Sequence, residues 1–181
     1  MNNTELIISQ TKKWIIDVVI GCNFCPFAAK EVKQNTVHYE VVYSDKQSEC
    51  VQSLLSECRR LDENTAIETS FLVMPVAVPG FKEYLGLVSL AERSLKKNGY
   101  EGVYQVASFH PLYQFAGTAD DDAANYTNRS VYPMLHLLRE ESIELALKKY
   151  TTPGNIPERN ILFAREKGLT YMQMLRDACL R

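Results

Sequence analysis

The amino-acid sequence predicts an α/β fold, with a small three-stranded sheet that is at least partly parallel and is flanked by helices. Two observations predict this fold class. Segments rich in β-branched and aromatic residues alternate with long segments of helical periodicity, which is typical of βαβ units. The chain has 181 residues, of which 46% are hydrophobic and 23% are charged, and it shows no repeat or linker. We therefore expect a single α/β domain over residues 1–181.

The first part of the chain predicts two helices and a strand. Residues 3–20 place isoleucine, valine and tryptophan at helical spacing, which predicts an amphipathic helix that ends at Gly21. The sequence CNFCPF follows, in which Pro26 suits the first position of a short second helix through Lys33, with Cys25 as its N-cap residue. Residues 36–43 (TVHYEVVY) are rich in β-branched and aromatic residues and predict the first strand.

The central part of the chain completes the alternation of strands and helices. The continuous apolar run TSFLVMPV indicates a strand that is buried on both faces. Asn98-Gly99 is a typical end for the helix that follows it. The elements predicted here are a helix from Asp45 to about Leu61, a strand over residues 69–76, a helix over residues 81–97 and a strand over residues 103–109.

The pattern changes after the third predicted strand. Residues 110–132 show neither strand nor helix periodicity and contain many polar and aromatic side chains. A long irregular segment inside a compact domain is often a binding or active-site loop. Beyond this loop, residues 133–150 predict a helix that is ended by residues 151–154, and a last helix follows Ile156 and reaches Cys179.

Charge and apolar runs argue against several partners. The formal net charge is −2 and the pI is about 6.0, and basic residues occur at most in pairs, so we expect no nucleic-acid partner. Residues 14–21 are apolar but are interrupted by Asp17 and are too short to span a membrane, so we expect no membrane association. We expect a cytoplasmic protein whose five cysteines are free thiols.

Cys25 and His110 are the first candidates for chemistry. A thiol at a helix N-terminus is stabilised as the thiolate by the helix dipole, which makes Cys25 the best nucleophile candidate, although a buried structural thiol is the alternative. His110 follows the third predicted strand, and ligands gather at the carboxyl ends of strands in open α/β sheets. We therefore assign His110 as a candidate general base or acid.

Further candidates lie in the loop and on the predicted helix after it. His136, Arg139 and Glu140 would share one helix face, either at a cleft or in a surface ion network. An arginine fork suits a carboxylate or a phosphate. His136 joins Cys25 and His110 as a candidate catalytic residue, and the candidate ligand-binding residues are Asp122, Asn125, Asn128, Arg129, Arg139 and Arg159.

Six motifs occur in order along the chain: CPFA (25–28), QVASFHP (105–111), YQFAGT (113–118), NYTNRS (125–130), YPMLHLLRE (132–140) and IPERN (156–160). Through these motifs the chain closely resembles an uncharacterised bacterial family that is recorded as a domain of unknown function. The resemblance covers nearly the whole chain and implies no established activity. In that family the first cysteine of the pair is usually an apolar residue, so Cys22 is a departure that leaves Cys25 standing alone.

Three functions stay open at this point. The first is an enzyme for a small anionic or polar metabolite, in which a thiol, an imidazole and arginines carry out acyl-type transfer or hydrolysis. The second is a metalloenzyme in which His110, His136 and one of Asp120, Asp121 and Asp122 bind a divalent metal ion. The third is a ligand-binding or partner-binding module without catalysis. The sequence identifies no cofactor, substrate or oligomeric state.

Overall fold

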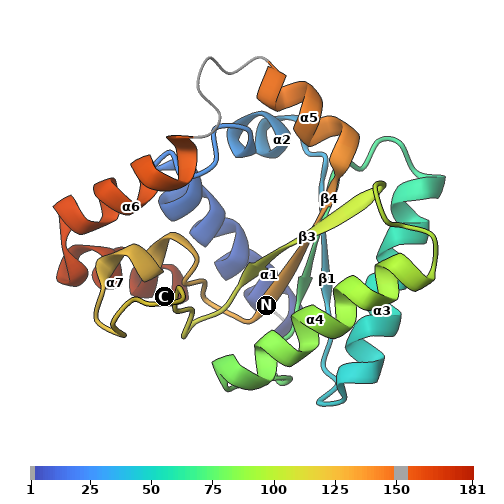
Figure 1. Ribbon diagram of the computed structural model, residues 1–181, viewed down its shortest axis with the longest axis horizontal. Coiled ribbons are helices and arrows are strands. Elements are labelled where there is room, and N and C mark those ends of the chain that lie inside the picture. Colours follow the sequence, from blue (N-terminus) through green and yellow to red (C-terminus); the bar gives the residue numbers. More distant parts are fainter. Residues whose placement is uncertain (1–2, 149–154) are drawn as a thin grey trace.

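A computed structural model describes residues 3–148 and 155–181 and confirms a mixed α/β fold built on one sheet (Figure 1). Over these residues the sheet has four strands and not the three expected: β1 (Val37–Val41), β2 (Thr69–Val73), β3 (Tyr104–Phe109) and β4 (Met134–Arg139). The strand order is β1-β2-β4-β3. Strands β1 and β2 are parallel, whereas β4 is antiparallel to both of its neighbours, so the sheet is partly parallel as predicted.

The fourth strand corrects the helix predicted over residues 133–150. Residues 134–139 form β4, and only α5 (Glu140–Lys148) is helical, while the rest of the predicted helix and its end lie outside the described residues. Leu135 and Leu137 point into one core and Met134 points into the other. A central strand that is covered on both faces shows no alternation of polar and apolar residues, and its leucines and methionine favour a helix in isolation.

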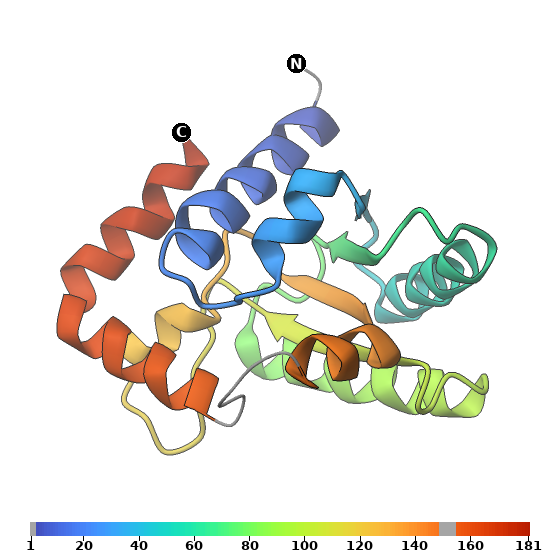
Figure 2. The same ribbon diagram turned by 90° about the horizontal axis from the view of Figure 1, so that it is seen from above.

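Helices cover both faces of the sheet (Figures 1 and 2). Helices α3 (Gln47–Glu63) and α4 (Phe81–Lys97) pack on one face over a core that contains Leu54, Leu87 and Leu135. Helix α1 (Asn3–Trp14) and the π-helix (Ile15–Ile20) that continues it pack on the other face, around Trp14 and Phe71. The helices are α1 (Asn3–Trp14), the π-helix Ile15–Ile20, α2 (Ala28–Gln34), α3 (Gln47–Glu63), α4 (Phe81–Lys97), α5, α6 (Ile156–Lys167) and α7 (Leu169–Asp177), with short 3-10 segments at Ala123–Thr127 and Ala178–Leu180.

Other sequence predictions are refined by the structure. All five residues of β2 are buried, which confirms burial on both faces, although the strand is shorter than predicted. The last helix is divided into α6 and α7 at Gly168, whose φ of 82° suits glycine. Cys25 is not the N-cap residue of α2, because a turn at residues 26–27 comes first and the helix begins at Ala28 with Phe27 as its cap. No helix among the described residues is long and apolar enough to span a membrane.

The first helix ends at Gly21 as predicted, but its last six residues form a π-helix. The backbone N–H of Gly21 donates to the carbonyl oxygen of Ile16 at 3.0 Å, which is the i to i−5 bond of a π-helix. A Cβ at residue 21 would lie 2.3 Å from the carbonyl oxygen of Asp17. The π-helical turn therefore requires glycine at this position.

Replacing Gly21 should test this geometry. We expect Gly21→Ala to lower the free energy of unfolding by about 1–3 kcal/mol, because the added methyl group overlaps a fixed backbone atom. Gly86→Ala is the matched control, since Gly86 lies within α4 with open space around it. Urea unfolding should show Gly86→Ala to be more stable than the wild type by about 0.5–1 kcal/mol. Equal stability of Gly21→Ala and the wild type would contradict the π-helical turn.

Candidate functional site

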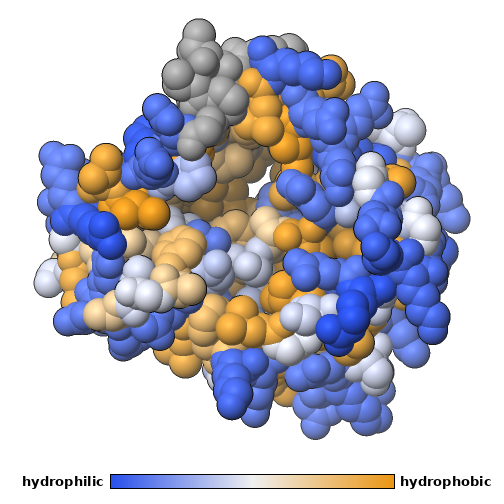
Figure 3. Space-filling model, viewed as in Figure 1, coloured by the Kyte–Doolittle hydropathy of each residue, from blue (hydrophilic) through white to orange (hydrophobic). Residues whose placement is uncertain are grey.

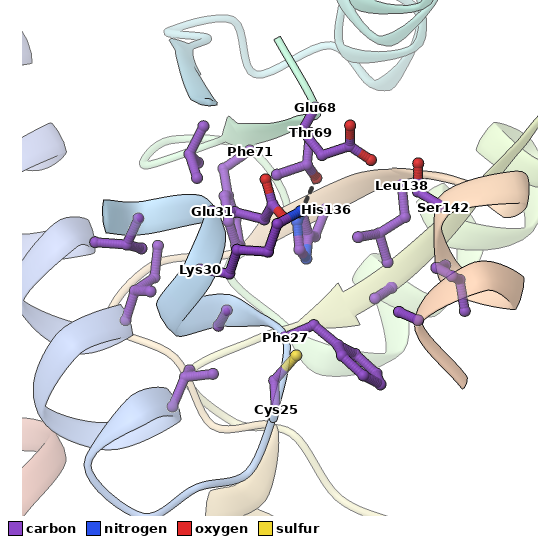
Figure 4. A pocket seen from close by; sticks show the side chains of 18 of the residues that line it. Cys25, Phe27, Lys30, Glu31, Glu68, Thr69, Phe71, His136, Leu138 and Ser142 are labelled. Atoms are coloured by element: carbon purple, nitrogen blue, oxygen red, sulfur yellow. Dashed lines mark hydrogen bonds and ion pairs between the residues drawn. The ribbon is translucent and has the colours of Figure 1, made fainter. Parts of the chain in front are cut away.

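A cavity of about 690 Å³ lies against the face of the sheet that carries α1 and the π-helix (Figure 4). The space-filling view shows a hollow with hydrophobic residues around it (Figure 3). Alternate residues of the strands form the floor, because side chains alternate between the two faces of a sheet. The floor consists of Val37, Thr69, Phe71, Gln105, Ala107, Phe109, His136 and Leu138, and the walls include Trp14, Ile15, Val19, Phe27, Val32, Ile143, Leu145 and Ala146.

The imidazole of His136 is fixed in one tautomer on this floor. Its Nε2 atom lies 2.6 Å from the hydroxyl oxygen of Thr69, the contact drawn as a dashed line in Figure 4. The same hydroxyl lies 2.6 Å from the carbonyl oxygen of Leu137, which can only accept a hydrogen bond. Because the single hydroxyl proton goes to Leu137, Nε2 of His136 must carry a proton and donate it to Thr69.

The other ring nitrogen of His136 opens on the cavity. Nδ1 has no hydrogen-bond partner among the described residues. Every buried side-chain nitrogen or oxygen of these residues has such a partner, so the Nδ1 atom itself is not buried. Nδ1 is therefore accessible to small molecules in the cavity. Burial lowers the pKa of His136 to about 3, so the ring is neutral at physiological pH and Nδ1 is a hydrogen-bond acceptor. The ring stacks on Phe71, with 3.8 Å between the ring centroids.

Cys25 lies on the same cavity. Its side chain is half-buried, and Figure 4 shows its sulfur pointing toward the cavity from the loop before α2. Cys22 is buried instead, and burial raises the pKa of its thiol. The two cysteines are both free thiols. The structure thus brings together two of the three predicted catalytic residues, Cys25 and His136.

Polar groups lie at the edge of the cavity. The ammonium group of Lys30 pairs with Glu31 at 2.9 Å, and the other carboxylate oxygen of Glu31 accepts a hydrogen bond from Thr36 at 2.6 Å. Glu68 and Ser142 also line the cavity, as Figure 4 shows. The interior of the cavity is therefore largely apolar. Lys30, the one lysine among the lining residues, already pairs with Glu31 at the edge.

His110, the third predicted catalytic residue, lies on the opposite face of the sheet. It is fully buried beside Phe81 and Tyr84 of α4. Its Nδ1 accepts the backbone N–H of Leu112 and its Nε2 donates to the carbonyl oxygen of Val78, each at 3.0 Å. Burial lowers the pKa of His110. Both ring nitrogens are hydrogen-bonded to backbone groups. His110 therefore has a structural role and is not accessible to a substrate.

Arg139 does not share a face with His136, which corrects the helical arrangement that the sequence suggested. Residues three apart on a strand point to opposite faces of a sheet. The Arg139 guanidinium donates to the carbonyl oxygens of Leu61 and Ile67, at 2.6 and 3.1 Å. Arg139 borders the cavity but its guanidinium holds the end of α3.

Polar side chains of the predicted binding loop form hydrogen bonds within the loop itself. Asn125 is fully buried, and its carbonyl oxygen accepts from the Phe115 N–H at 3.0 Å and from the Thr118 hydroxyl at 2.9 Å. Its amide nitrogen donates to the carbonyl oxygens of Ala119 and Asp120, at 2.8 and 3.3 Å. Every hydrogen-bonding position of this side chain is occupied by backbone groups of the loop or by the Thr118 hydroxyl, which leaves none for a ligand.

Arg129 and Asn128 are engaged in the same way. The Arg129 side chain is only 8% exposed, and its Nε atom donates to the carbonyl oxygen of Tyr113 at 2.9 Å. Its Nη2 atom donates to the carboxylate of Asp120 at 2.7 Å. Asn128 donates to the carbonyl oxygen of Ser108 at 3.1 Å. These side chains fold the loop against the end of β3.

Asp122 and Arg159 connect other segments to α6. The carboxylate of Asp122 pairs with Arg165 of α6 at 2.7 Å and accepts the backbone N–H of Ala124, and Arg165 lowers the pKa of this carboxyl. Arg159, also on α6, donates to the carbonyl oxygen of Asn23. Neither residue lines the cavity. The ligand-binding set predicted from the sequence is therefore not gathered around one site.

The predicted two-histidine metal site is not assembled, because His110 and His136 lie on opposite faces of the sheet. Among the described residues, one group has its ligand atoms close enough for a metal ion: His38, Glu40 and Glu57. Arg60 already bonds to Glu57 at 2.9 Å and lies 3.9 Å from Glu40. The guanidinium thus already compensates the negative charge of the two carboxylates.

Sequence reasoning missed most of the cavity floor. Thr69, Phe71 and Ala107 were placed on predicted strands but were not identified as site residues. The signal that could have found them is the side-chain period of two, which puts residues 69 and 71 on one face of β2 and residues 105 and 107 on one face of β3. The strand containing His136 was needed to join these two faces.

The fold and the cavity define a class of protein: a four-stranded α/β protein with a ligand-sized, largely apolar cavity beside its sheet. The chain belongs to a family described as a protein of unknown function, DUF1415, which matches residues 6–174. This match confirms the resemblance to an uncharacterised domain family. Neither the curated proteins nor the solved structures provide a match to this chain.

Glu57 should make stability depend on pH in the acid range. Burial alone would raise the pKa of Glu57, but hydrogen bonds from His38, Ser70 and Arg60 outweigh it and lower the pKa to about 2 from an ordinary value of 4.5. The ionised carboxylate therefore stabilises the fold above about pH 4.5, and this contribution is lost as the pH falls towards 2. The contribution at pH 7 is on the order of 3 kcal/mol.

Urea unfolding of Glu57→Gln at pH 7 and at pH 3 checks this expectation. The variant should be destabilised strongly at pH 7 and less at pH 3. Glu92→Gln, at an exposed position of α4, is the control and should match the wild type at both values. A Glu57→Gln protein with the same loss at both pH values would contradict the lowered pKa.

Proposed function

We propose that this protein binds a predominantly apolar small molecule in the cavity, with one hydrogen-bond donor of that molecule on Nδ1 of His136. One observation carries the proposal: an unpaired acceptor nitrogen on a neutral ring stands on the floor of an otherwise largely apolar cavity of about 690 Å³. Small-molecule sites are commonly cavities of about 300–1,000 Å³ with apolar walls and a few fixed polar groups. The ligand's hydroxyl, amide or other donor would be held by His136.

The charges around the cavity favour an uncharged ligand over the anionic metabolite that the sequence suggested. His136 is neutral, and Lys30 is paired with Glu31. Glu68 adds a second carboxylate to the lining. The arginines expected to orient an anion are engaged by backbone carbonyls or by Asp120. An anion entering this cavity would lose its hydration without gaining an unpaired cation.

The single tryptophan provides a direct measurement. Trp14 lines the cavity and packs edge-on against Phe109, with 5.2 Å between the ring centroids. We expect 1-decanol to change the Trp14 fluorescence saturably, with a dissociation constant roughly in the micromolar to submillimolar range. The isomeric ether 1-methoxynonane has the same atoms but no donor, and it should bind about five- to tenfold more weakly, because one hydrogen bond is lost.

Variants of His136 connect this preference to Nδ1. Phenylalanine keeps the flat ring beside Phe71, and the Thr69 hydroxyl keeps its bond to Leu137. His136→Phe should therefore fold and should bind the alcohol and the ether equally. Absence of saturable binding of either molecule to the wild type would exclude the proposed function. Equal affinity of the wild type for both molecules would remove the role of Nδ1.

Binding should also be insensitive to pH near neutrality. The pKa of His136 is about 3, so Nδ1 remains an acceptor at every pH above about 5. Affinity for 1-decanol should stay constant from pH 5 to pH 8 and should fall as Nδ1 is protonated near pH 3. A loss of affinity between pH 7 and pH 6 would mean that His136 titrates with an ordinary pKa. Repeating the titration with 1-decanol at each pH, followed by Trp14 fluorescence, measures this dependence.

Acyl transfer by Cys25 is a second candidate function, which is favoured by the position of its sulfur on the same cavity. In this reaction the sulfur would bond to the acyl carbon of an ester, and the alcohol would leave with the thiol proton. Water would then release the acid and restore the thiol. His136 is a weak base with its pKa of about 3, which disfavours rapid thiolate formation and places this function second.

Incubation with 4-nitrophenyl decanoate tests the second function. If Cys25 is a nucleophile, one equivalent of 4-nitrophenol should be released in a burst, and mass spectrometry should locate the decanoyl group on Cys25. Cys25→Ser should abolish the burst, whereas Cys22→Ala should keep it because Cys22 is buried. Release at the rate of free glutathione, without a burst, would leave the protein as a binding protein only.

A further inference from the structure

Four side chains form a row across one face of the sheet, and three of them, Phe71, His136 and Ala107, lie on the floor of the cavity. The strand register pairs Tyr39 with Phe71, Phe71 with His136 and His136 with Ala107. Tyr39 and Phe71 are stacked with an interplanar angle of 11°, and Phe71 and His136 are stacked with an angle of 10°. Three flat rings therefore follow one another across β1, β2 and β4, and the row ends in a methyl group on β3.

The free face of His136 looks toward Ala107. One face of the imidazole covers Phe71, with 3.8 Å between the ring centroids, so the opposite face is directed along the row to the next strand. Neighbouring strands lie about 4.8 Å apart, which is close to the thickness of one stacked ring. Phe109, two residues along β3, contacts His136 only at 6.3 Å and with a tilt of 39°. The place above Ala107 is therefore a slot for one ring.

The cavity extends over this slot. Ala107 is half-buried and lines the cavity, so its methyl group is not covered by another element. Helix α5 contributes two small side chains, Ser142 and Ala146, and two larger ones, Ile143 and Leu145, to the walls of the cavity. Because Ala107 carries only a methyl group and borders a cavity of about 690 Å³, the cavity offers room beside it for a ring of the ligand.

We propose that the ligand of this cavity carries a planar aromatic ring that lies above Ala107 and stacks on His136, continuing the row of Tyr39 and Phe71. This inference rests on the proposed function and names the class of ligand. A stacked ring lies on the face of the imidazole, whereas Nδ1 accepts in the ring plane. The donor therefore belongs on a short flexible arm of the aromatic molecule, such as a hydroxyalkyl or amide substituent.

A matched pair of ligands tests the stacking. The probes are 2-(2-naphthyl)ethanol and its fully ring-saturated analogue, which share the skeleton and the hydroxyl arm, with 1-decanol as the reference ligand. Calorimetric titration of the wild type should show the aromatic alcohol to bind roughly three- to tenfold more tightly than the saturated one. Equal or reversed affinities, with 1-decanol bound, would overturn the stacking inference and leave the proposed function standing. Failure of all three molecules to bind would overturn both.

Two substitutions at His136 separate stacking from hydrogen bonding. His136→Phe keeps a flat ring beside Phe71 and should retain the preference for the aromatic alcohol. His136→Leu removes the ring and should bind the two alcohols equally. Retention of the preference in His136→Leu would place the aromatic ring elsewhere and would overturn the inference.

Filling the slot gives an independent result. Ala107→Phe should complete the row with a side chain of the protein and should weaken the aromatic alcohol by at least tenfold. The control Ala66→Phe adds the same ring at an exposed position outside the cavity and should leave the affinity unchanged. Thermal unfolding establishes that each variant is folded, and the comparison of the two His136 variants decides the matter if Ala107→Phe does not fold. Unchanged affinity in a folded Ala107→Phe protein would overturn the inference.

Discussion

The pairing of β4 between β2 and β3 is the constraint on which the rest of the structure depends. Backbone hydrogen bonds to both neighbours fix the register, so that His136 lies between Phe71 and Ala107. The same register directs Leu135 and Leu137 into the core under α3 and α4. A slip of one residue would turn the imidazole into that core and would put Leu135 and Leu137 on the face of the sheet that forms the cavity floor.

Much of the fold could be predicted from the sequence, because three strands and the helices between them show clear periodicity. Helix α4 was predicted with its observed ends. Strand β4 could not be found in this way, since it pairs on both edges and is covered on both faces. Its identity as a strand is set by neighbours that are distant in the sequence, and local preference for a helix is overridden.

The candidate site could be predicted only in part. Cys25 and His136 were selected for their chemistry, and both line the cavity. Asn125 and Arg129 were selected because polar residues are dense in the loop, but a buried irregular backbone needs partners of its own. Their side chains supply those partners, and so does His110. Sequence composition cannot distinguish a side chain that serves a ligand from one that serves its own loop.

The central position of β4 has a consequence for folding. Strands β1 and β2 can pair with each other early, but β3 touches neither of them in the sheet. Strand β4, the last strand among the described residues, is the one that joins β3 to the rest of the sheet. During synthesis on a ribosome, the floor of the cavity is therefore incomplete until residues 134–139 have emerged. Pairing of β4 with β2 also requires closure of the long loop of residues between them. The floor of the cavity is therefore complete only once the central pairing of the sheet has formed.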